Sequence, residues 1–403
     1  MRALDKKRLL LGVCGGIAAY KAAYLVRALM REGADVSVVM TAAATRFVSP
    51  LTFATLSGKP CLTDDDLFRP DASVSHVEAG RRADLILLAP ATANTIAKIA
   101  HGFADNVLSA AVMASTCPVL LVPSMHVGMW TNPFVQHNLA ALSSGRYRVM
   151  PPDHGELASG DQGPGRFPEV SCIVQEAARC CGKQDLSGRV VVITAGPTAE
   201  PLDAVRVLTN PSSGRMGLAL AKAAWRRGAV VRMVLGPVPA PESSLPFETI
   251  RVGTAQQMLD ATRTALDGAH VLIMAAAVAD EHPVGVVERK LHKDELPDHL
   301  ALEPTPDILM SLRSELSDKV VLAFAAETED LRSSGAAKMI RKGADLLFAN
   351  PVGEGRGFGA AHNEGVLLGP GNMVEEAPRQ LKEDLAEWLL DHVVKRLSGN
   401  PEE

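Results

Sequence analysis

The run Leu9-Leu10-Leu11-Gly12-Val13, followed by Cys14-Gly15-Gly16, decides the fold of the first half of the chain. A strand that is apolar throughout is typical of a parallel sheet, because helices cover both faces of such a sheet. The glycines then allow a tight turn into a helical stretch over residues 18–31, and residues 36–40 form the next apolar strand. This order of elements predicts a βαβ unit.

The same order recurs near residue 190. Residues 190–194 are an apolar strand, residues 195–197 form the turn, and a helix over residues 215–227 precedes a strand over residues 230–235. Further strands are expected at residues 85–89, 119–122, 271–275, 320–324 and 346–349, and a last helix at residues 379–397. We therefore predict an α/β protein with two doubly wound parallel-sheet domains in tandem, joined by the polar segment 181–188.

The composition excludes several classes of protein. At about 150 residues per domain, a chain of 403 residues predicts two or three domains, and 47% hydrophobic with 22% charged residues is too apolar for disorder. A net charge of −5 and 4% aromatic residues argue against nucleic acid and anionic membranes as partners. The apolar run after the basic N-terminus is too short for a signal peptide, prolines break the uncharged stretch 107–125, and the six cysteines form no C-x-x-C pair. We expect a cytoplasmic protein that does not span a membrane.

Ligands of such sheets bind in the segments that follow the strands. Gly15 and Gly16 let the backbone approach a ligand at the start of a helix, although the same pair also suits plain packing of a strand against a helix. Dinucleotide-binding proteins usually place an Asp or Glu after the second strand, whereas this chain has Met40-Thr41-Ala42. This difference favours a mononucleotide such as FMN, with the Thr41 hydroxyl available to its phosphate or ring.

Five segments of the first half, in sequence order, resemble the flavin-dependent cysteine decarboxylases, a family of homo-oligomeric proteins. They are residues 15–17, Ser75-His76-Val77-Glu78, residues 90–95, residues 123–130 and residues 160–166. The resemblance implies a flavodoxin-like decarboxylase domain over residues 1–182 that binds FMN. The FMN-binding residues that it implies are Gly15, Gly16, Ile17, Thr41, Thr92, Asn94 and Thr95, the substrate-binding residues are His126, Met129 and Arg166, and the catalytic residues are His76 and Ser159.

In that family the flavin oxidises the thiol of a cysteine derivative to a thioaldehyde, which lets carbon dioxide leave, and the residue that matches His76 serves the proton transfers beside the carboxylate. Two residues depart from the family pattern, since His126 stands where Asn is usual and Ser159 where a proton-donating Cys is usual. His126 still offers a hydrogen bond to a carboxylate. Ser159 is a much weaker acid than Cys, so either it relays a proton, another group substitutes for it, or the reaction stops at the enethiol.

The second half carries the loop Thr209-Asn210-Pro211-Ser212-Ser213-Gly214 before its first helix, which fits an N-cap or an anion-binding loop but is not the G-x-x-x-x-G-K-[ST] phosphate loop. This loop, with residues 195–198, 275–280 and 324–328, resembles phosphopantothenate–cysteine ligase over nearly all of residues 187–403. The two halves in this order resemble the bifunctional CoaBC family of coenzyme A synthesis. The resemblance implies that CTP and Mg²⁺ activate 4′-phosphopantothenate as an acyl-cytidylate, that cysteine attacks it, and that decarboxylation then gives 4′-phosphopantetheine.

The ligase resemblance implies a Rossmann-like domain and assigns roles by motif. Asn210 would contact the acyl intermediate, Lys290 would stabilise the transition state, and Asp280 would hold the nucleotide and its metal ion. The other CTP-binding residues that it implies are Met274, Ala275, Ala276, Thr305, Pro306, Asp307, Ile308, Phe324, Lys338 and Lys342, together with Lys290 itself. Without these motifs, the spacing of Lys338 and Lys342 indicates only a solvated helix face.

The resemblance further implies a homo-oligomer, in which flavin-binding domains form trimers, ligase domains form dimers and both together form a dodecamer, with small-molecule substrates as the other partners. Two alternatives stay open from the residues alone. Because of Ser159, the protein could be a ligase only, with a first half that is inactive or stops at the enethiol. Because relatives of the first half inhibit phosphatases, that half could also be a binding or scaffold module.

Overall fold

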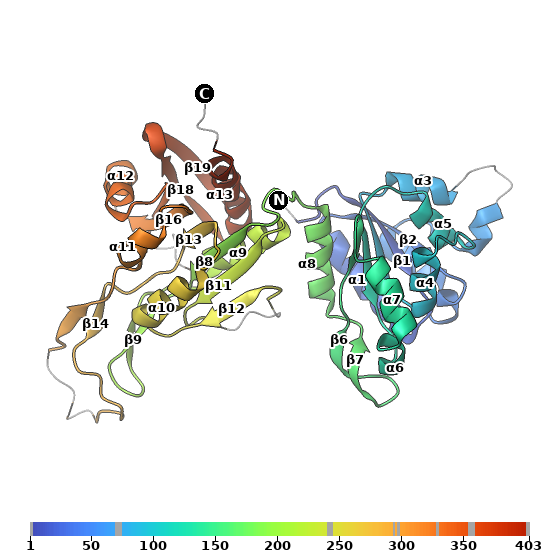
Figure 1. Ribbon diagram of the computed structural model, residues 1–403, viewed down its shortest axis with the longest axis horizontal. Coiled ribbons are helices and arrows are strands. Elements are labelled where there is room, and N and C mark those ends of the chain that lie inside the picture. The colour runs from blue at the N-terminus through green and yellow to red at the C-terminus, as the bar shows by residue number, and fades with distance from the viewer. Residues whose placement is uncertain are drawn as a thin grey trace. The chain divides into compact units, whose positions relative to one another are not determined.

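The computed structural model describes residues 3–68, 75–239, 245–292, 295, 299–327, 330–353 and 359–399. The chain divides into two compact units, Met1–Gly182 and Lys183–Glu403. Each unit is an α/β fold on a mainly parallel sheet, so the predicted fold class is confirmed (Figure 1). Within the ranges just given, every helix is too short or too polar to cross a membrane.

In the described part of the first unit, five parallel strands form a sheet in the order β2-β1-β3-β4-β5. The strands are β1 (Arg8–Val13), β2 (Asp35–Met40), β3 (Leu85–Ala91), β4 (Val119–Pro123) and β5 (Tyr147–Val149). The four longer strands confirm the sequence prediction to within two residues, because their apolar runs are buried on both faces. The edge strand β5 was not predicted, since its three residues are only partly buried and carry no clear pattern.

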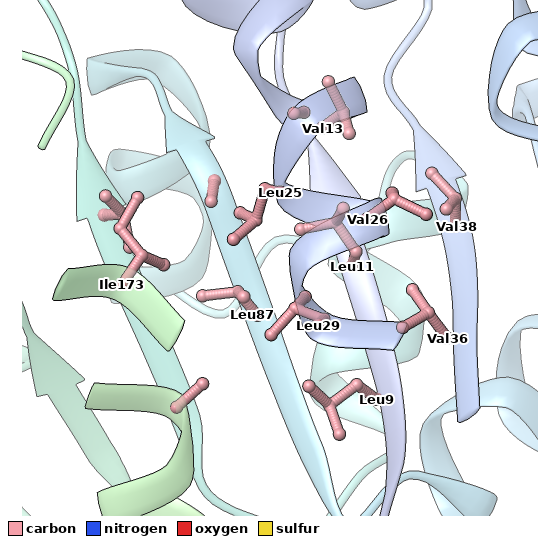
Figure 2. Close-up of a cluster of buried hydrophobic side chains, with 14 of the residues drawn as sticks. Leu9, Leu11, Val13, Leu25, Val26, Leu29, Val36, Val38, Leu87 and Ile173 are labelled. Atoms are coloured by element: carbon pink, nitrogen blue, oxygen red, sulfur yellow. The ribbon is translucent and has the colours of Figure 1, made fainter. Parts of the chain in front are cut away.

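Helices cover both faces of this sheet. They are α1 (Lys21–Arg31), α2 (Pro50–Ser57), α3 (Ser75–Arg82), α4 (Ala93–Ala100), α5 (Val107–Met113), α6 (Val127–Trp130), α7 (Pro133–Ala141) and α8 (Val170–Cys181), with short 3-10 turns at η1 (Ile17–Tyr20), η2 (Ala44–Arg46) and η3 (Asp64–Phe68). One stripe of α1, including Leu25 and Leu29, packs against β1, β2, β3 and Ile173 of α8 (Figure 2). Helices α4, α5 and α7 contribute to a second core that includes Leu88 of β3. The helix expected over residues 18–31 is α-helical from Lys21, and its first turn is 3-10.

An antiparallel hairpin follows the sheet of the first unit. It is formed by β6 (Asp153–Glu156) and β7 (Gln162–Arg166), and residues 153–166 are called the flap below. The base of the flap contacts the segment before α6, because the Met125 N–H donates to the Gly165 carbonyl at 3.0 Å. A Cβ on Gly165 would lie 2.1 Å from the Met125 oxygen, so only glycine permits this approach.

The described residues of the second unit include a sheet of eight strands in the order β12-β11-β8-β13-β16-β17-β18-β19. The strands are β8 (Val190–Ala195), β11 (Val230–Leu235), β12 (Glu248–Arg251), β13 (Val271–Met274), β16 (Val320–Glu327), β17 (Leu346–Pro351), β18 (His362–Gly369) and β19 (Met373–Leu381). The first six in sheet order are parallel, whereas β18 and β19 add antiparallel strands at one edge.

The prediction that a helix begins at residue 379 was wrong. His362 of β18 pairs with Leu381 of β19, so residues 379–381 complete the antiparallel ladder. The last helix, α13 (Lys382–Leu397), begins after this pairing ends, and Glu383 and Asp384 in its first turn favour that start. The alternating burial along β19 lacks the continuous apolar run by which the buried strands were found.

Helices again cover both faces of the second sheet. They are α9 (Arg215–Arg226), α10 (Ala255–Ala265), α11 (Ile308–Leu312) and α12 (Leu331–Lys342), together with α13. Residues of α9 and α13 share one core with β8 and β11, whereas α10 and α11 contribute to the other. Two short hairpins, β9 (Ala199–Pro201) with β10 (Val207–Thr209) and β14 (Glu281–Pro283) with β15 (Leu302–Pro304), form separate two-stranded sheets.

Candidate functional site

A cavity of about 920 Å³ lies at the carboxyl ends of β1, β2, β3 and β4 in the first unit. It gathers the residues that the sequence assigned to FMN and substrate in this half, and the flap residue Ser159. These residues are Gly15, Gly16, Ile17, Thr41, Thr92, Asn94, Thr95, His126, Met129, Ser159 and Arg166. Parallel strands bring the segments after them to one edge of the sheet, which is why residues far apart in sequence lie together.

The glycine pair after β1 has two different environments. A Cβ on Gly15 would lie 2.4 Å from the Ala43 Cβ, so this turn packs directly against the loop that follows β2. A Cβ on Gly16 would have Thr92 Cγ2 as its nearest neighbour, at 3.8 Å. Gly15 therefore permits close packing of two loops of the cavity wall, whereas Gly16 keeps the backbone open towards the cavity.

Uncharged polar groups line the wall that follows β3. Thr92 is the N-cap of α4, and its Oγ1 accepts the Thr95 N–H at 3.4 Å. The start of an α-helix presents backbone N–H groups that suit an anion such as phosphate. On the neighbouring loop, Thr41 Oγ1 accepts the Ala44 N–H at 3.3 Å. The buried Cys14 lies beneath this wall, and burial raises the pKa of its thiol.

Several charged residues of the cavity were missed by the sequence analysis. Lys98 of α4 forms an ion pair with Asp105 at 2.7 Å. Asp64 accepts the Ala42 N–H at 3.3 Å and the Val107 N–H at 3.0 Å, so it joins the loop after β2 to the start of α5. Asp64 and Asp105 do not directly follow a strand, and rules based on strand ends therefore overlook them.

His126 and the tip of the flap form a hydrogen-bonded network at the cavity. His126 caps α6, where its Nδ1 accepts the Gly128 N–H at 3.0 Å, and this arrangement places the ring hydrogen on Nε2. Nε2 then donates to Asp161 Oδ2 at 2.7 Å, and Ser159 Oγ donates to the same oxygen at 2.8 Å. The hydrogen bond from His126, and next that from Ser159, lowers the pKa of the Asp161 carboxyl.

Two catalytic residues were predicted in the first unit, and one of them, His76, does not line this cavity. It lies on α3 and lines a second cavity of about 540 Å³, together with Leu67, Asp105 and Met113. Its Nδ1 is buried and finds no hydrogen-bond partner among the described residues. Asp105 lines both cavities. Within one chain, His76 therefore lines a different cavity from His126 and Ser159.

In the second unit, hydrogen bonds join the loops that carry several predicted ligase residues. Asn210 Nδ2 donates to the carbonyls of Ala277, at 3.3 Å, and Val278, at 3.0 Å, so the loop after β10 is tied to the loop after β13. Thr305 Oγ1 donates to the Ala279 carbonyl, and the Thr305 N–H donates to the Asp280 carbonyl at 3.0 Å. Asn210, Asp280 and Thr305 thus belong to one connected set of loops.

Strand β13 ends at Met274, which is buried, and Ala275 and Ala276 follow half-buried. The Ala276 N–H donates to Thr194 Oγ1 on the neighbouring strand β8 at 3.3 Å. Phe324 of β16 packs edge-on against Phe348 of β17, with ring centroids 5.6 Å apart. Ala275, Ala276 and Phe324 provide an apolar surface beside the ends of the central strands, whereas the Met274 side chain belongs to the core.

The segment before α11 meets α12 through an ion pair. Asp307 caps α11 by accepting the Met310 N–H at 3.2 Å, and Lys342 Nζ lies 3.7 Å from Asp307 Oδ2. Pro306 is half-buried, and Ile308 is buried in the core, so the Ile308 side chain is not available to a ligand. One turn before Lys342, Lys338 pairs with Glu327 at 2.6 Å.

Lys290 is exposed on a segment whose neighbours are fixed on both sides. The Leu291 N–H donates to Asp203 Oδ2 at 3.1 Å, and Arg206 Nη1 donates to the Leu291 carbonyl at 3.2 Å. Burial alone would raise the pKa of Asp203, but the N–H groups of Val205, Arg206 and Leu291 lower it to about 2. This buried carboxylate therefore holds the backbone beside Lys290.

Glu295 fixes the same segment from the other side. Arg289 donates two hydrogen bonds to its carboxylate, at 2.7 and 2.6 Å, and the His292 N–H donates at 2.8 Å. The bonds from Arg289, and next that from His292, lower the pKa of Glu295 to about 2. In the part of the chain that is described, we find no cluster of three or more His, Cys, Asp or Glu side chains that could hold a metal ion. Asp280, the predicted metal ligand, is exposed.

Most of the cysteine side chains are partly buried, and Cys14 is fully buried. Burial raises the pKa of Cys61, Cys180 and Cys181 to about 12. Like Cys14 and Cys117, they are free thiols. None of these five thiols lines the cavity of the first unit.

Both halves of the chain match known protein families. Residues 1–181 match the family model described as flavoprotein, and residues 186–397 match that of the DNA/pantothenate metabolism flavoprotein C-terminal domain. Over 394 residues the chain is 40% identical to the coenzyme A biosynthesis bifunctional protein CoaBC of Bacillus subtilis (strain 168). The aligned residues make up 97% of each of the two chains. Over 376 residues it is 42% identical to the protein of the same name from Vibrio vulnificus (strain YJ016), with 92% and 93% covered. A solved C-terminal domain of a CoaBC protein is 32% identical, covers 54% of this chain and 100% of its own, and has a TM-score of 0.47.

Proposed function

The chain belongs to the CoaBC family of bifunctional coenzyme A biosynthesis proteins, and we propose that it makes 4′-phosphopantetheine in two stages. The second unit, residues 187–403, joins cysteine to 4′-phosphopantothenate with CTP as co-substrate. The first unit, residues 1–182, decarboxylates the resulting phosphopantothenoylcysteine. The relatives match over both units, so they give no support to a protein that is only a ligase.

The cavity of the first unit carries this proposal, because its walls fit FMN. Its volume of about 920 Å³ lies within the range of cofactor sites. The open backbone at Gly16, the start of α4 and the uncharged Thr and Asn side chains suit a phosphate and a neutral heteroaromatic ring. The residues that would hold FMN are Gly15, Gly16, Ile17, Thr41, Thr92, Asn94 and Thr95. Bound FMN would supply two-electron oxidation of the substrate thiol.

The remaining residues of the cavity would bind and orient the substrate. Arg166 offers a positive charge to an anionic group, and Met129 offers an apolar contact. Ser159 and His126 present polar atoms on the same side, at the flap and at α6. The orientation of these two side chains decides which atoms of the substrate they bind.

His76 lies outside the cavity of its own chain, so we propose that a second copy of the protein brings it to the substrate. Large apolar side chains beside the cavity are exposed in the single chain, including Ile17 at 61%, Tyr20 at 51% and Met129 at 47%. Such side chains are covered when subunits associate. We infer a homo-oligomer with trimeric first units, dimeric second units and a dodecameric whole.

In the second unit, the chain's own charges would bind CTP and neutralise its triphosphate. Lys338 and Lys342 supply positive charge from one side of α12, and Lys290 supplies it from the segment that Asp203 fixes. Mg²⁺ is commonly held by one or two carboxylates together with substrate phosphates, so the single exposed Asp280 fits this role. The Asn210 amide would contact the acyl intermediate, and the backbone of Met274 with Ala275, Ala276 and Phe324 would lie against cytidine. Thr305, Pro306, Asp307 and the backbone of Ile308 would complete the site.

We place this chemistry in the cytoplasm, with small molecules as its substrates. Free thiols at Cys14, Cys61, Cys117, Cys180 and Cys181 support a reducing compartment.

The test supplies phosphopantothenate, cysteine, CTP and Mg²⁺ to the full chain without oxygen and identifies the products by mass. We expect pyrophosphate and 4′-phosphopantetheine. Two variants separate the stages, because His76→Asn should accumulate phosphopantothenoylcysteine, whereas Lys290→Gln should release no pyrophosphate yet still decarboxylate supplied phosphopantothenoylcysteine. Absence of pyrophosphate in the unmodified protein would disprove the ligase assignment. A product that stops at the enethiol, two hydrogens lighter than phosphopantetheine, would disprove the complete decarboxylase.

A further inference from the structure

We propose that Asp161 is a positioning residue for decarboxylation, which holds Ser159 and His126 as one hydrogen-bonded unit at the cavity. The inference rests on the proposed function of the first unit. It concerns the two residues that depart from the family pattern, and it assigns a role to a third residue that the sequence analysis left without one.

The geometry places one carboxylate oxygen between the two side chains. His126 Nε2 donates to Asp161 Oδ2 at 2.7 Å, and Ser159 Oγ donates to the same atom at 2.8 Å. On the other side of the ring, His126 Nδ1 accepts the Gly128 N–H at 3.0 Å. Both ring nitrogens therefore have partners, and the hydrogen of each side chain points at Asp161.

The backbone places Asp161 at this point. At the tip of the flap, the Leu157 N–H donates to the Asp161 carbonyl at 2.9 Å, and the Gly160 N–H donates to the Leu157 carbonyl at 2.9 Å. Gly160 has a φ of +87°, which favours glycine in this turn. A Cβ on Gly163 would lie 2.8 Å from Val127 Cγ2, so β7 packs closely on α6. The flap is thus fixed at its base, and Asp161 is the side chain that joins its tip to α6.

This arrangement has a chemical consequence for each partner. The Ser159 hydrogen is directed to Asp161, so its oxygen lone pairs are the part of the hydroxyl that remains for the substrate. The His126 ring is held with its hydrogen on Nε2, and a substrate carboxylate can take that hydrogen bond only by replacing Asp161. Asp161 therefore decides the orientation of both side chains before the substrate arrives, which is the condition for efficient positioning.

The first test is kinetic and uses the full chain with FMN. We expect Asp161→Ala and Ser159→Ala each to lower the kcat of decarboxylation by about 10- to 100-fold, with a smaller change in KM. Because the residues act through one oxygen, the double variant should lose little more than Asp161→Ala alone. Asp161→Leu, which keeps the size of the side chain but has no acceptor oxygen, provides the same test if Asp161→Ala does not fold. The ligase activity of each variant should stay unchanged and reports that the protein is intact.

The second test needs neither FMN nor turnover. Diethyl pyrocarbonate reacts with an imidazole nitrogen that has a free lone pair, and peptide mass spectrometry measures the rate at each histidine. We expect Asp161→Ala to raise the rate at His126 severalfold, since the ring is released, whereas Ser159→Ala leaves the Asp161–His126 bond in place and should not. His101 of the same unit, whose Nδ1 lies 2.9 Å from the Ala97 carbonyl, should react at the same rate in every variant.

The outcomes separate this inference from the proposed function. If the unmodified protein does not decarboxylate, the proposed function fails, while the labelling of His126 still tests the network. If it does decarboxylate, a kcat for Asp161→Ala within twofold of the unmodified value, or independent losses from Ser159→Ala and Asp161→Ala, would overturn the positioning role. Equal labelling of His126 with and without Asp161 would overturn the hydrogen-bonded unit itself.

Discussion

Replacing Gly15 by alanine should destabilise the first unit, whereas replacing its neighbour Gly16 should not, although both residues belong to one turn. At Gly15 the new Cβ would lie 2.4 Å from the Ala43 Cβ and 2.7 Å from the Ala43 carbonyl carbon. At Gly16 it would lie 3.8 Å from its nearest neighbour, a methyl group of Thr92. The φ of Gly16 is −152°, and Gly15 is not among the glycines with positive φ, so alanine is compatible with the backbone at both positions.

The expected free energies follow from these distances. Both changes make the unfolded chain less flexible, which stabilises the folded state by about 0.4–1 kcal/mol where the native backbone accepts alanine. At Gly15 an overpacking cost of about 1–3 kcal/mol opposes this gain. We therefore expect Gly15→Ala to lower the free energy of unfolding by up to about 2.5 kcal/mol, and Gly16→Ala to leave it unchanged or slightly raised. At about 2–4 °C per kcal/mol for a unit of this size, the two variants should melt several degrees apart.

The assay is differential scanning calorimetry of the full chain, with and without FMN. The second unit contains neither glycine, so its transition serves as the internal reference. We expect only Gly15→Ala to lower the melting temperature of the first unit without FMN. If the two variants melt together, the close approach of the turn to Ala43 does not limit stability, and the explanation given for Gly15 is wrong.

Three further predictions concern the second unit. Asp203→Asn should slow ligation without affecting decarboxylation of supplied phosphopantothenoylcysteine, because the backbone beside Lys290 loses its anchor; equal ligation rates would contradict the anchor. Acid should lower the free energy of unfolding of the second unit, because the pKa values of Asp203 and Glu295 are lowered to about 2. The stabilisation from these carboxylates is complete above their usual pKa of about 4 and is lost as pH falls towards 2. Urea unfolding at pH 6 and pH 3 measures this loss, and a midpoint that does not change with pH would refute it. Lys338→Met should raise the KM for CTP about tenfold, whereas Arg341→Met, an exposed change on the same helix, should not; equal KM values would remove Lys338 from the triphosphate site.

The strands at the centre of both sheets could be predicted because burial on two faces makes them apolar throughout. That signal found β1, β3, β8 and β13. It missed β18, whose apolar run is only residues 366–368, and β19, whose first residues alternate between half-buried and exposed. It also extended the last helix into residues 379–381. Pairing with a distant strand decides the conformation of those three residues, and the local spacing of apolar residues does not contain that information.

The candidate site shows the same limit. The rule that ligands bind after parallel strands led to Gly15, Thr41, Thr92 and His126, which line one cavity. The contact between His126 and Asp161 could not be predicted, because it joins residues 35 positions apart through the fold of the flap. The place of His76 in a separate cavity likewise depends on how α3 packs, which the motif around it does not specify.

The buried thiols have a consequence for an enzyme that handles sulfur compounds. Thiol–disulfide exchange requires a thiolate, and with pKa values of about 12 the sulfurs of Cys61, Cys180 and Cys181 are almost entirely protonated at neutral pH. At these three positions the protein therefore presents almost no thiolate that could compete with the cysteine substrate or the thiol product. These three side chains are therefore poor nucleophiles toward a disulfide formed from cysteine or from the thiol product.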